Sequence, residues 1–167
     1  MSLLILSVGS NAHGADREHQ IKSAFIYNFA KFIEWPGGLG DSNSNFVIGI
    51  YGASAFEDEL QLALAGKSVL GHPIEIEEVR SDSAVRRCRI LITGANTEER
   101  IFQLLRVCKA NGTVLVGESP DFARMGGTVG FAIEAGKVRF DVNLKTAKSD
   151  DLVISSKLLS LARTVIH

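Results

Sequence analysis

Residues 46–51 read FVIGIY, a short apolar run of strand-forming residues between turn-forming residues, and this pattern predicts a buried β-strand. Two similar runs follow, CRILIT at residues 88–93 and TVLV at residues 113–116, and residues 73–79 predict one more strand. Segments with apolar residues at helical spacing separate these strands. Such alternation predicts right-handed crossovers and a largely parallel sheet.

The helices between the strands have recognisable starts. Ser54 can cap a helix that runs to about residue 65. Asn96 and Glu99 together resemble a capping box at the start of the next helix. The apolar face expected for this second helix consists of Ile101, Leu104, Leu105 and Cys108.

The segment before the first strand predicts a helix over residues 16–35. Apolar residues recur there at near-helical spacing, at Ile21, Phe25, Phe29 and Phe32. Pro36 ends the helix because proline cannot continue the hydrogen-bond ladder. This ending leaves Trp35 as the last residue of the predicted helix.

The first fifteen residues resemble the tail of a secretory signal. Residues 1–8 read MSLLILSV, and small and polar residues follow as far as residue 15. A frayed terminal strand is the alternative interpretation. No other stretch approaches the roughly 18 apolar residues that a membrane span needs. We therefore expect residues 16–167 to form one exported domain.

The last third of the chain predicts a different arrangement. Ser119 followed by Pro120 predicts a short helix that ends near residue 125. Residues 128–134 and 138–144 predict an antiparallel hairpin, and the alternation in its second strand predicts one wet face, formed by Arg139, Asp141 and Asn143. Ser155 or Ser156 caps a final helix whose stripe extends to Val165. The predicted fold is α/β, with a mixed, largely parallel sheet of about six strands flanked by helices and a C-terminal antiparallel hairpin.

The overall composition is that of a globular protein with balanced charge. Of the 167 residues, 46% are hydrophobic and 22% are charged, and 18 basic against 19 acidic residues give a net charge of −1. The basic residues form no long run. The composition therefore predicts no nucleic-acid partner, no polybasic membrane segment and no membrane insertion.

The motifs of common active sites are incomplete. Gly66-Lys67-Ser68 resembles the end of a phosphate-binding loop, but Gln61 stands where that loop needs a glycine. No G-x-S-x-G occurs, and the proline after Ser119 removes a backbone donor that an oxyanion hole would need. The four histidines, His13, His19, His72 and His167, lack the spacing of a metal site. The sequence predicts a non-enzyme without cofactor or metal.

The two cysteines allow two interpretations. Cys88 opens a predicted strand and Cys108 closes the helix after it, so both lie at the same edge of a βα unit. Their α-carbons can then approach within the roughly 4.4–6.8 Å that a disulfide requires, and the alternative is two buried thiols. At the C-terminus, Arg163 and His167 are four residues apart and predict either a cationic tip or a plain solvated end of the last helix.

Three stretches occur together in one order: AFIYNFAKFIEWP at residues 24–36, VGESPDFA at 116–123 and ISSKLL at 154–159. With the hairpin strand FDVNL at 140–144, they resemble the YfiR/HmsC-like periplasmic regulators, over about residues 18–165. The resemblance implies an exported α/β domain that represses a membrane-bound diguanylate cyclase by binding its periplasmic part, and thereby lowers cyclic di-GMP and biofilm formation.

The resemblance also implies further partners and covalent links. Members of this family form homodimers, an outer-membrane lipoprotein can sequester them, and disulfides stabilise the better-known ones. Cys88 resembles a cysteine position of that group. The chain lacks the cysteine pair that those members carry near the late hairpin, so the resemblance does not extend to redox control.

Residues that could contact a partner or ligand lie in two places. Trp35 is a candidate anchor, although core packing is the plainer interpretation. The other place is Glu118 to Arg124, just after a strand, where open α/β sheets usually place ligand sites. Its candidates are Glu118, Ser119, Asp121, Phe122 and Arg124, and the alternative is a short helix that covers the sheet edge.

The leading hypothesis for the function is a repressor that acts by protein contact. The others are a sensor with a pocket for an apolar or aromatic ligand near Trp35 and Phe122, and an enzyme with an unrecognised site.

Overall fold

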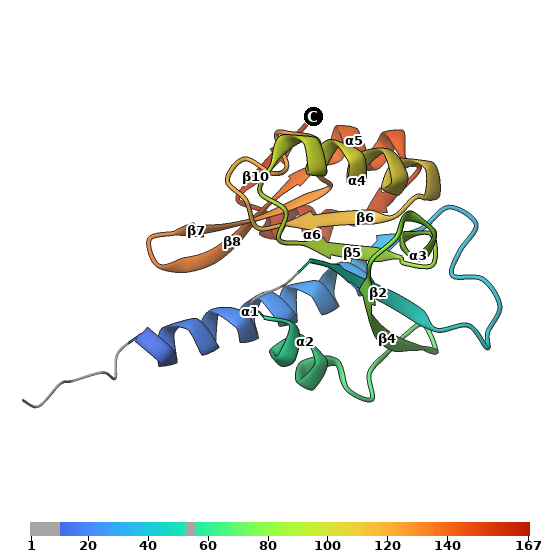
Figure 1. Cartoon of the computed structure of the whole chain (residues 1–167), viewed down its shortest axis with the longest axis horizontal. Helices are drawn as coiled ribbons and strands as arrows, with labels where there is room; N and C mark the ends of the chain where they lie inside the picture. The colour runs from blue at the N-terminus through green and yellow to red at the C-terminus, as the bar shows by residue number, and fades with distance from the viewer. Residues whose placement is uncertain (1–10, 53–55) are drawn as a thin grey trace, which may run out of the picture.

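A central eight-stranded sheet organises the molecule in a computed structural model that describes residues 11–52 and 56–167, with side chains from residue 13 onward (Figure 1). The strand order is β10-β8-β7-β6-β5-β2-β4-β3. These strands are β2 (Phe46–Tyr51), β3 (Ser68–Val69), β4 (His72–Val79), β5 (Ile90–Thr93), β6 (Val114–Gly117), β7 (Val129–Glu134), β8 (Lys137–Asn143) and β10 (Thr164–Ile166). A separate two-stranded antiparallel sheet joins β1 (Ile33–Glu34) to β9 (Val153–Ile154).

The helices are α1 (Asn11–Phe32), α2 (Glu57–Leu64), α3 (Asp82–Val85), α4 (Glu98–Asn111), α5 (Leu144–Ser149) and α6 (Ser156–Leu161). None of the helices in the described part of the chain has the length and apolar character needed to cross a bilayer. Ser54, the predicted cap, lies outside the described residues. The predicted signal remnant also lies outside them as far as residue 10, and residues 11–15 belong to α1.

The pairing confirms the predicted fold class. Strands β4, β2, β5, β6 and β7 run parallel to one another, and β7 and β8 form the predicted antiparallel hairpin. The sheet has two more strands than the sequence indicated. These are β3 and β10 at its edges, which are only two and three residues long and therefore too short to show a strand pattern in the sequence.

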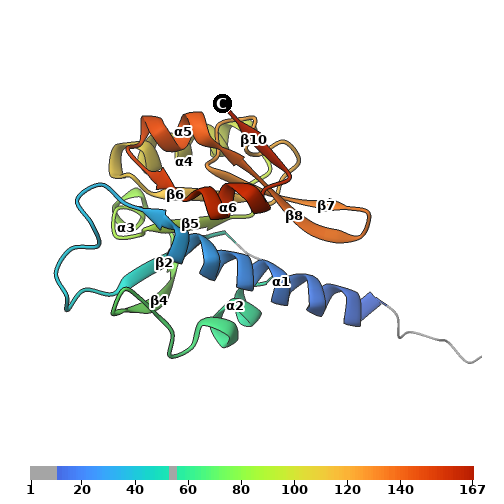
Figure 2. The same cartoon turned by 180° about the vertical axis from the view of Figure 1, so that it is seen from behind.

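Helices cover both faces of the sheet, with α1 and α4 on opposite sides (Figures 1 and 2). Side chains that alternate along β5 supply both cores. Ile90 and Ile92 pack in the cluster that contains Ile26 and Phe29 of α1, and Leu91 packs in the cluster of α4. This two-sided burial explains why the sequence of β5 is a continuous apolar run.

The first helix ends earlier than predicted. It stops at Phe32, and Ile33 and Glu34 pair with Ile154 and Val153 across the small sheet. Trp35 is therefore not helical. The helical spacing that extends through Ile33 is overridden by this long-range pairing, which the local pattern does not contain.

Near the C-terminus one predicted helix is absent, and another ends earlier than predicted. Residues 119–126 form turns instead of a short helix, since Asp121 has a φ of 59°, which interrupts the helical conformation. Ser155 caps α6 as predicted, because its hydroxyl accepts a hydrogen bond from the Leu158 amide at 3.2 Å. The helix nevertheless ends at Leu161, and the chain continues as β10, which runs parallel to β8.

Two smaller predictions also fail. The cap of α4 is Thr97, without a side-chain hydrogen bond, so Asn96 and Glu99 form no capping box. The second hairpin strand has no wet face at Asp141 and Asn143, which are only 8% and 6% exposed. β10 pairs beside Asp141, and the turns after β6 bond to Asn143, so tertiary contacts cover polar residues that the alternation had assigned to solvent.

Candidate functional site

Residues 119–126, called here the Phe122 turn, sit at the carboxyl end of β6. The ring of Phe122 is 1% exposed and occupies a slot built from glycines. A Cβ atom on Gly117 would lie 2.3 Å from this ring, and one on Gly127 would lie 2.1 Å from it. Phe122 therefore anchors the turn from inside, and it is not the exposed contact that the sequence suggested.

Hydrogen bonds hold the same turn to the end of the hairpin. Asn143 Nδ2 donates to the Ala123 carbonyl at 2.8 Å, and Thr146 Oγ1 donates to the Gly126 carbonyl at 3.1 Å. Because these carbonyls are paired with side chains of β8 and α5, the turn is a fixed surface. The exposed side chains of Asp121 and Arg124 form an ion pair at 3.4 Å on its outside, with 71% and 65% of each accessible to water.

Lys22 of α1 ties the first helix to this edge of the sheet. Its ammonium lies 2.6 Å from a carboxylate oxygen of Glu118 and 2.6 Å from one of Glu18, and the side chain is only 8% exposed. Burial acts to lower the pKa of Lys22, but the hydrogen bonds and charges of Glu118 and Glu18 outweigh it, so that the pKa is raised. No local pattern in the sequence points to the contact of Lys22 with Glu118, because these two residues are 96 positions apart.

Arg163 forms the second ion pair of this edge. Its guanidinium bonds both carboxylate oxygens of Asp141, with Nε at 2.8 Å and Nη2 at 2.5 Å. The hydrogen bond to Asp141 raises the pKa of Arg163. The predicted cationic helix tip is wrong, since Arg163 and His167 flank strand β10, where four residues span roughly 13 Å instead of one helical turn.

A surface pocket of about 410 Å³ lies between the Phe122 turn and the hairpin, and it is called here the edge pocket. Of the predicted candidates, it brings together Glu118, Asp121, Phe122 and Arg163. Its walls also include Pro120, Phe131, Ile133 and Asp141. Ile133 is 52% exposed, so the pocket offers one accessible aliphatic side chain beside three carboxylates and one guanidinium.

Ser119 lies beside this pocket without lining it. Its hydroxyl is buried and has no hydrogen-bond partner within the part of the chain that the structure describes. Its predicted role as a helix cap is lost with the helix.

Trp35 lies at the opposite edge of the parallel strands. It is 6% exposed, its indole donates to the Arg89 carbonyl at 3.2 Å, and its ring meets Phe46 edge-on at 5.2 Å. Arg89 and Phe46 stand at the start of their strands, whereas Phe122 follows the end of β6. Trp35 and Phe122 therefore do not share a pocket. Trp35 packs in the core, which was the plainer of its two interpretations.

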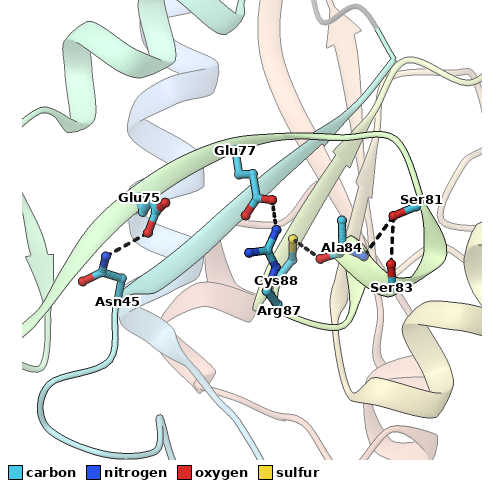
Figure 3. A network of polar contacts seen from close by, with 8 residues as sticks. All are labelled: Asn45, Glu75, Glu77, Ser81, Ser83, Ala84, Arg87 and Cys88. Atoms are coloured by element: carbon cyan, nitrogen blue, oxygen red, sulfur yellow. Dashed lines mark hydrogen bonds and ion pairs between the residues drawn. The ribbon is translucent and has the colours of Figure 1, made fainter.

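Cys88 is one of a row of residues that make polar contacts (Figure 3), and it packs on the face of the sheet that α4 covers. Its thiol donates to the Ala84 carbonyl at 3.5 Å, and Arg87 next to it pairs with Glu77. Burial raises the pKa of the Cys88 thiol to about 12. Burial likewise raises the pKa of Cys108, and both sulfurs pack in the α4 cluster. Thiols held neutral in this way are poor nucleophiles.

Both cysteines are free thiols in the structure, and the disulfide stays a prediction of the sequence. Within the described residues, no group of three His, Cys, Asp or Glu side chains is arranged to hold a metal ion.

Comparisons with known proteins bear on the family and on the fold. The family described as YfiR/HmsC-like matches residues 19–163. No curated protein matches the chain.

Two solved structures share the fold. The ABC domain from Streptococcus pneumonia, solved in complex with L-Trp, is 13% identical with a TM-score of 0.53, over 92% of this chain and 60% of that one. A conserved domain protein from Vibrio cholerae O1 biovar El Tor is 10% identical with a TM-score of 0.58, over 86% of this chain and 59% of that one. The chain thus spans about 60% of the length of these two structures.

Proposed function

The chain belongs to the YfiR/HmsC-like family, whose members are periplasmic regulators of diguanylate cyclase signalling, and from this premise we propose that it represses a membrane-bound diguanylate cyclase. The repression works by direct contact with the periplasmic part of the cyclase. It lowers cyclic di-GMP and biofilm formation, and the protein itself performs no chemistry.

The observation that carries the proposal is the rim of the edge pocket. Ile133, at 52% exposure, stands beside Asp121 and the Asp141–Arg163 pair on a surface that the buried Phe122 ring keeps fixed. An exposed aliphatic residue within a polar rim is the composition of a small protein interface. The surface is preorganised, so that binding costs little ordering of side chains.

The test combines cyclic di-GMP measurements with capture of the partner. Cells that lack the protein should contain more cyclic di-GMP, and the natural chain should restore the lower level. The Ile133→Glu variant places a charge on the rim and should fail to restore it. Leu62→Glu is the matched control, because Leu62 is 75% exposed on α2, away from the pocket.

Binding is measured with the purified periplasmic part of the cyclase. The natural chain and Leu62→Glu should bind, and Ile133→Glu should bind at least tenfold more weakly. Unchanged cyclic di-GMP in cells without the protein contradicts the repressor function. Equal binding by both variants contradicts the assignment of the edge pocket alone.

The quaternary contacts belong to the same proposal. The regulator is a homodimer in the periplasm, and an outer-membrane lipoprotein sequesters it from the cyclase. Light scattering after size exclusion measures the molar mass and so tests whether the protein is a dimer. Release of the cyclase when the lipoprotein is added to the complex tests whether the lipoprotein sequesters the regulator.

A small-molecule sensor is the second candidate, and the size of the edge pocket favours it. A volume of about 410 Å³ falls within the range of roughly 300–1,000 Å³ typical of ligand sites. Phe131 and Ile133 supply apolar wall, and Arg163 supplies a cation. Indole is a suitable aromatic probe: binding that raises Tm for the natural chain but not for Ile133→Glu supports the sensor, and the absence of any shift contradicts it for this ligand class.

A further inference from the structure

Three lysines, one on α1 and two from distant parts of the chain, alternate with two aromatic rings of α1. Lys31 lies 5.1 Å from the ring of Tyr27 and 5.5 Å from the ring of Phe32. Lys67 lies 5.4 Å from Tyr27, and Lys157 of α6 lies 4.9 Å from Phe32. These five residues form one continuous surface, called here the lysine stripe.

The elements that carry the stripe lie side by side. Figure 2 shows α1 across the front of the molecule, with α6 on one side and α2 on the other. The Tyr27 hydroxyl donates to the Ser68 carbonyl at 3.4 Å, which fixes the end of the stripe near β3. The order along the surface is therefore Lys67, Tyr27, Lys31, Phe32 and Lys157.

The charges of the stripe are available to a partner. The three lysines are exposed, and within the described residues no carboxylate oxygen lies within 4.0 Å of any of their ammonium groups. The protein as a whole carries a net charge of −1, so this positive surface is local and gives the molecule a preferred orientation toward anions.

Exposed aliphatic side chains follow both end lysines of the stripe closely along the chain. Leu70, three residues after Lys67, is 88% exposed and has a φ of 49°, a conformation that disfavours leucine. Leu161 is 47% exposed and follows Lys157 by one helical turn on α6. Leu70 thus occupies a strained, solvent-exposed turn in which asparagine or glycine would have a lower conformational energy.

We propose that the lysine stripe docks the protein on the surface of a bilayer that contains anionic phospholipids. Lysine ammonium groups pair with lipid phosphates, aromatic rings lie at the depth of the headgroups, and Leu70 and Leu161 enter the boundary of the acyl chains. A protein partner fits less well, because the cores of protein interfaces are depleted in lysine and enriched in arginine. The docking does not rest on the proposed function, since it requires no cyclase.

Binding to vesicles tests the proposal with the full chain at low salt. One set of vesicles contains phosphatidylglycerol and phosphatidylcholine in equal parts, and the other contains phosphatidylcholine alone. The stripe variant carries Lys31→Gln, Lys67→Gln and Lys157→Gln. The matched control carries Lys109→Gln, Lys145→Gln and Lys148→Gln, three exposed lysines of α4 and α5.

We expect the natural chain and the control to bind the anionic vesicles, and the stripe variant to bind about a hundredfold more weakly, at roughly fivefold per lysine. Added salt should weaken the binding of the natural chain. Leu70→Asn should also weaken binding while it keeps or raises Tm, because asparagine tolerates the conformation at this position. All chains carry the same apolar N-terminus, so any contribution of residues 1–8 cancels in the comparison.

Three results would overturn the proposal. They are equal binding to both kinds of vesicle, equal losses in the stripe variant and in the control, and equal binding of the natural chain to soluble polyglutamate and to anionic vesicles. The last result would assign the stripe to an acidic protein partner.

Discussion

The Lys22 ammonium lies 2.6 Å from a carboxylate oxygen of Glu118, and this contact joins the first helix to the residue that follows strand β6. The same ammonium bonds Glu18 one turn earlier in α1 and lies 5.7 Å from the ring of Phe56 and 5.9 Å from that of Phe131. One buried cation therefore links α1 with the start of the segment that forms the edge pocket.

Replacement of Lys22 by methionine should destabilise the protein. The change leaves Glu118 without its cation in a poorly solvated place, and we expect the free energy of unfolding to fall by about 2 kcal/mol. Urea denaturation measures the loss. In the double variant with Glu118→Gln the loss should be smaller than the sum of the two single losses, whereas additive losses would contradict the coupling.

Alanine at Gly127 should strain the slot that holds Phe122. The new Cβ would lie 2.1 Å from the ring, so the turn must move, at a cost of about 1–3 kcal/mol. Gly14→Ala is the control, because nothing lies within 4 Å of that position and the residue is helical; it should stabilise α1 slightly. Thermal unfolding compares the two variants, and equal Tm values would contradict the slot.

Loss of the Arg163 guanidinium should free the last strand. Arg163→Met removes both bonds to Asp141, and we expect β10 to fray from β8 at a cost of about 1 kcal/mol, since a side chain with 32% exposure is partly screened by water. Hydrogen exchange of the Val165 and Ile166 amides should become faster. Arg80→Ala removes a solvent-exposed ion pair with Glu78 and should change neither exchange nor stability.

The two buried thiols should make the fold sensitive to alkali. Burial raises the pKa of Cys88 from 9.0 to about 12, so the folded state keeps a proton that the unfolded state loses above pH 9. The stabilisation is complete below pH 9 and is lost as the pH rises toward 12, at about 1.4 kcal/mol per cysteine at pH 10. Urea denaturation at pH 7.5 and pH 10 measures this loss, and Cys88→Ala should show a smaller difference between the two pH values. An unchanged difference would contradict the raised pKa.

Thiol labelling without reductant separates the two states of the cysteines. As buried thiols, Cys88 and Cys108 should react very slowly in the folded protein, and both should react after unfolding. No labelled sulfur after unfolding would instead establish the bridge, which is the other interpretation that the sequence allows.

The sequence by itself determined the interior strands of the sheet and the helices that connect them. Runs such as residues 46–51 and 90–93 are buried on both faces, so their apolar character is continuous and easily recognised. The hairpin was equally plain, because two strand-forming segments flank the short stretch from Ala135 to Lys137. In the structure Ala135 and Gly136 form its two-residue turn, and both take positive φ values. The three local motifs that indicate the family also lie in single stretches of the chain.

Only the tertiary structure decided the end of the first helix, strand β10, the glycine slot of Phe122 and the lysine stripe. Each depends on partners that are far apart in sequence: Ile33 pairs with Ile154, Lys22 with Glu118, and Lys31 stands in a row with Lys67 and Lys157. Periodicity reports how one segment partitions between water and core, but it carries no information about which distant segment covers it. For that reason the fold class could be predicted from the chain, whereas the edge pocket and the lysine stripe could be found only after folding had brought their residues together.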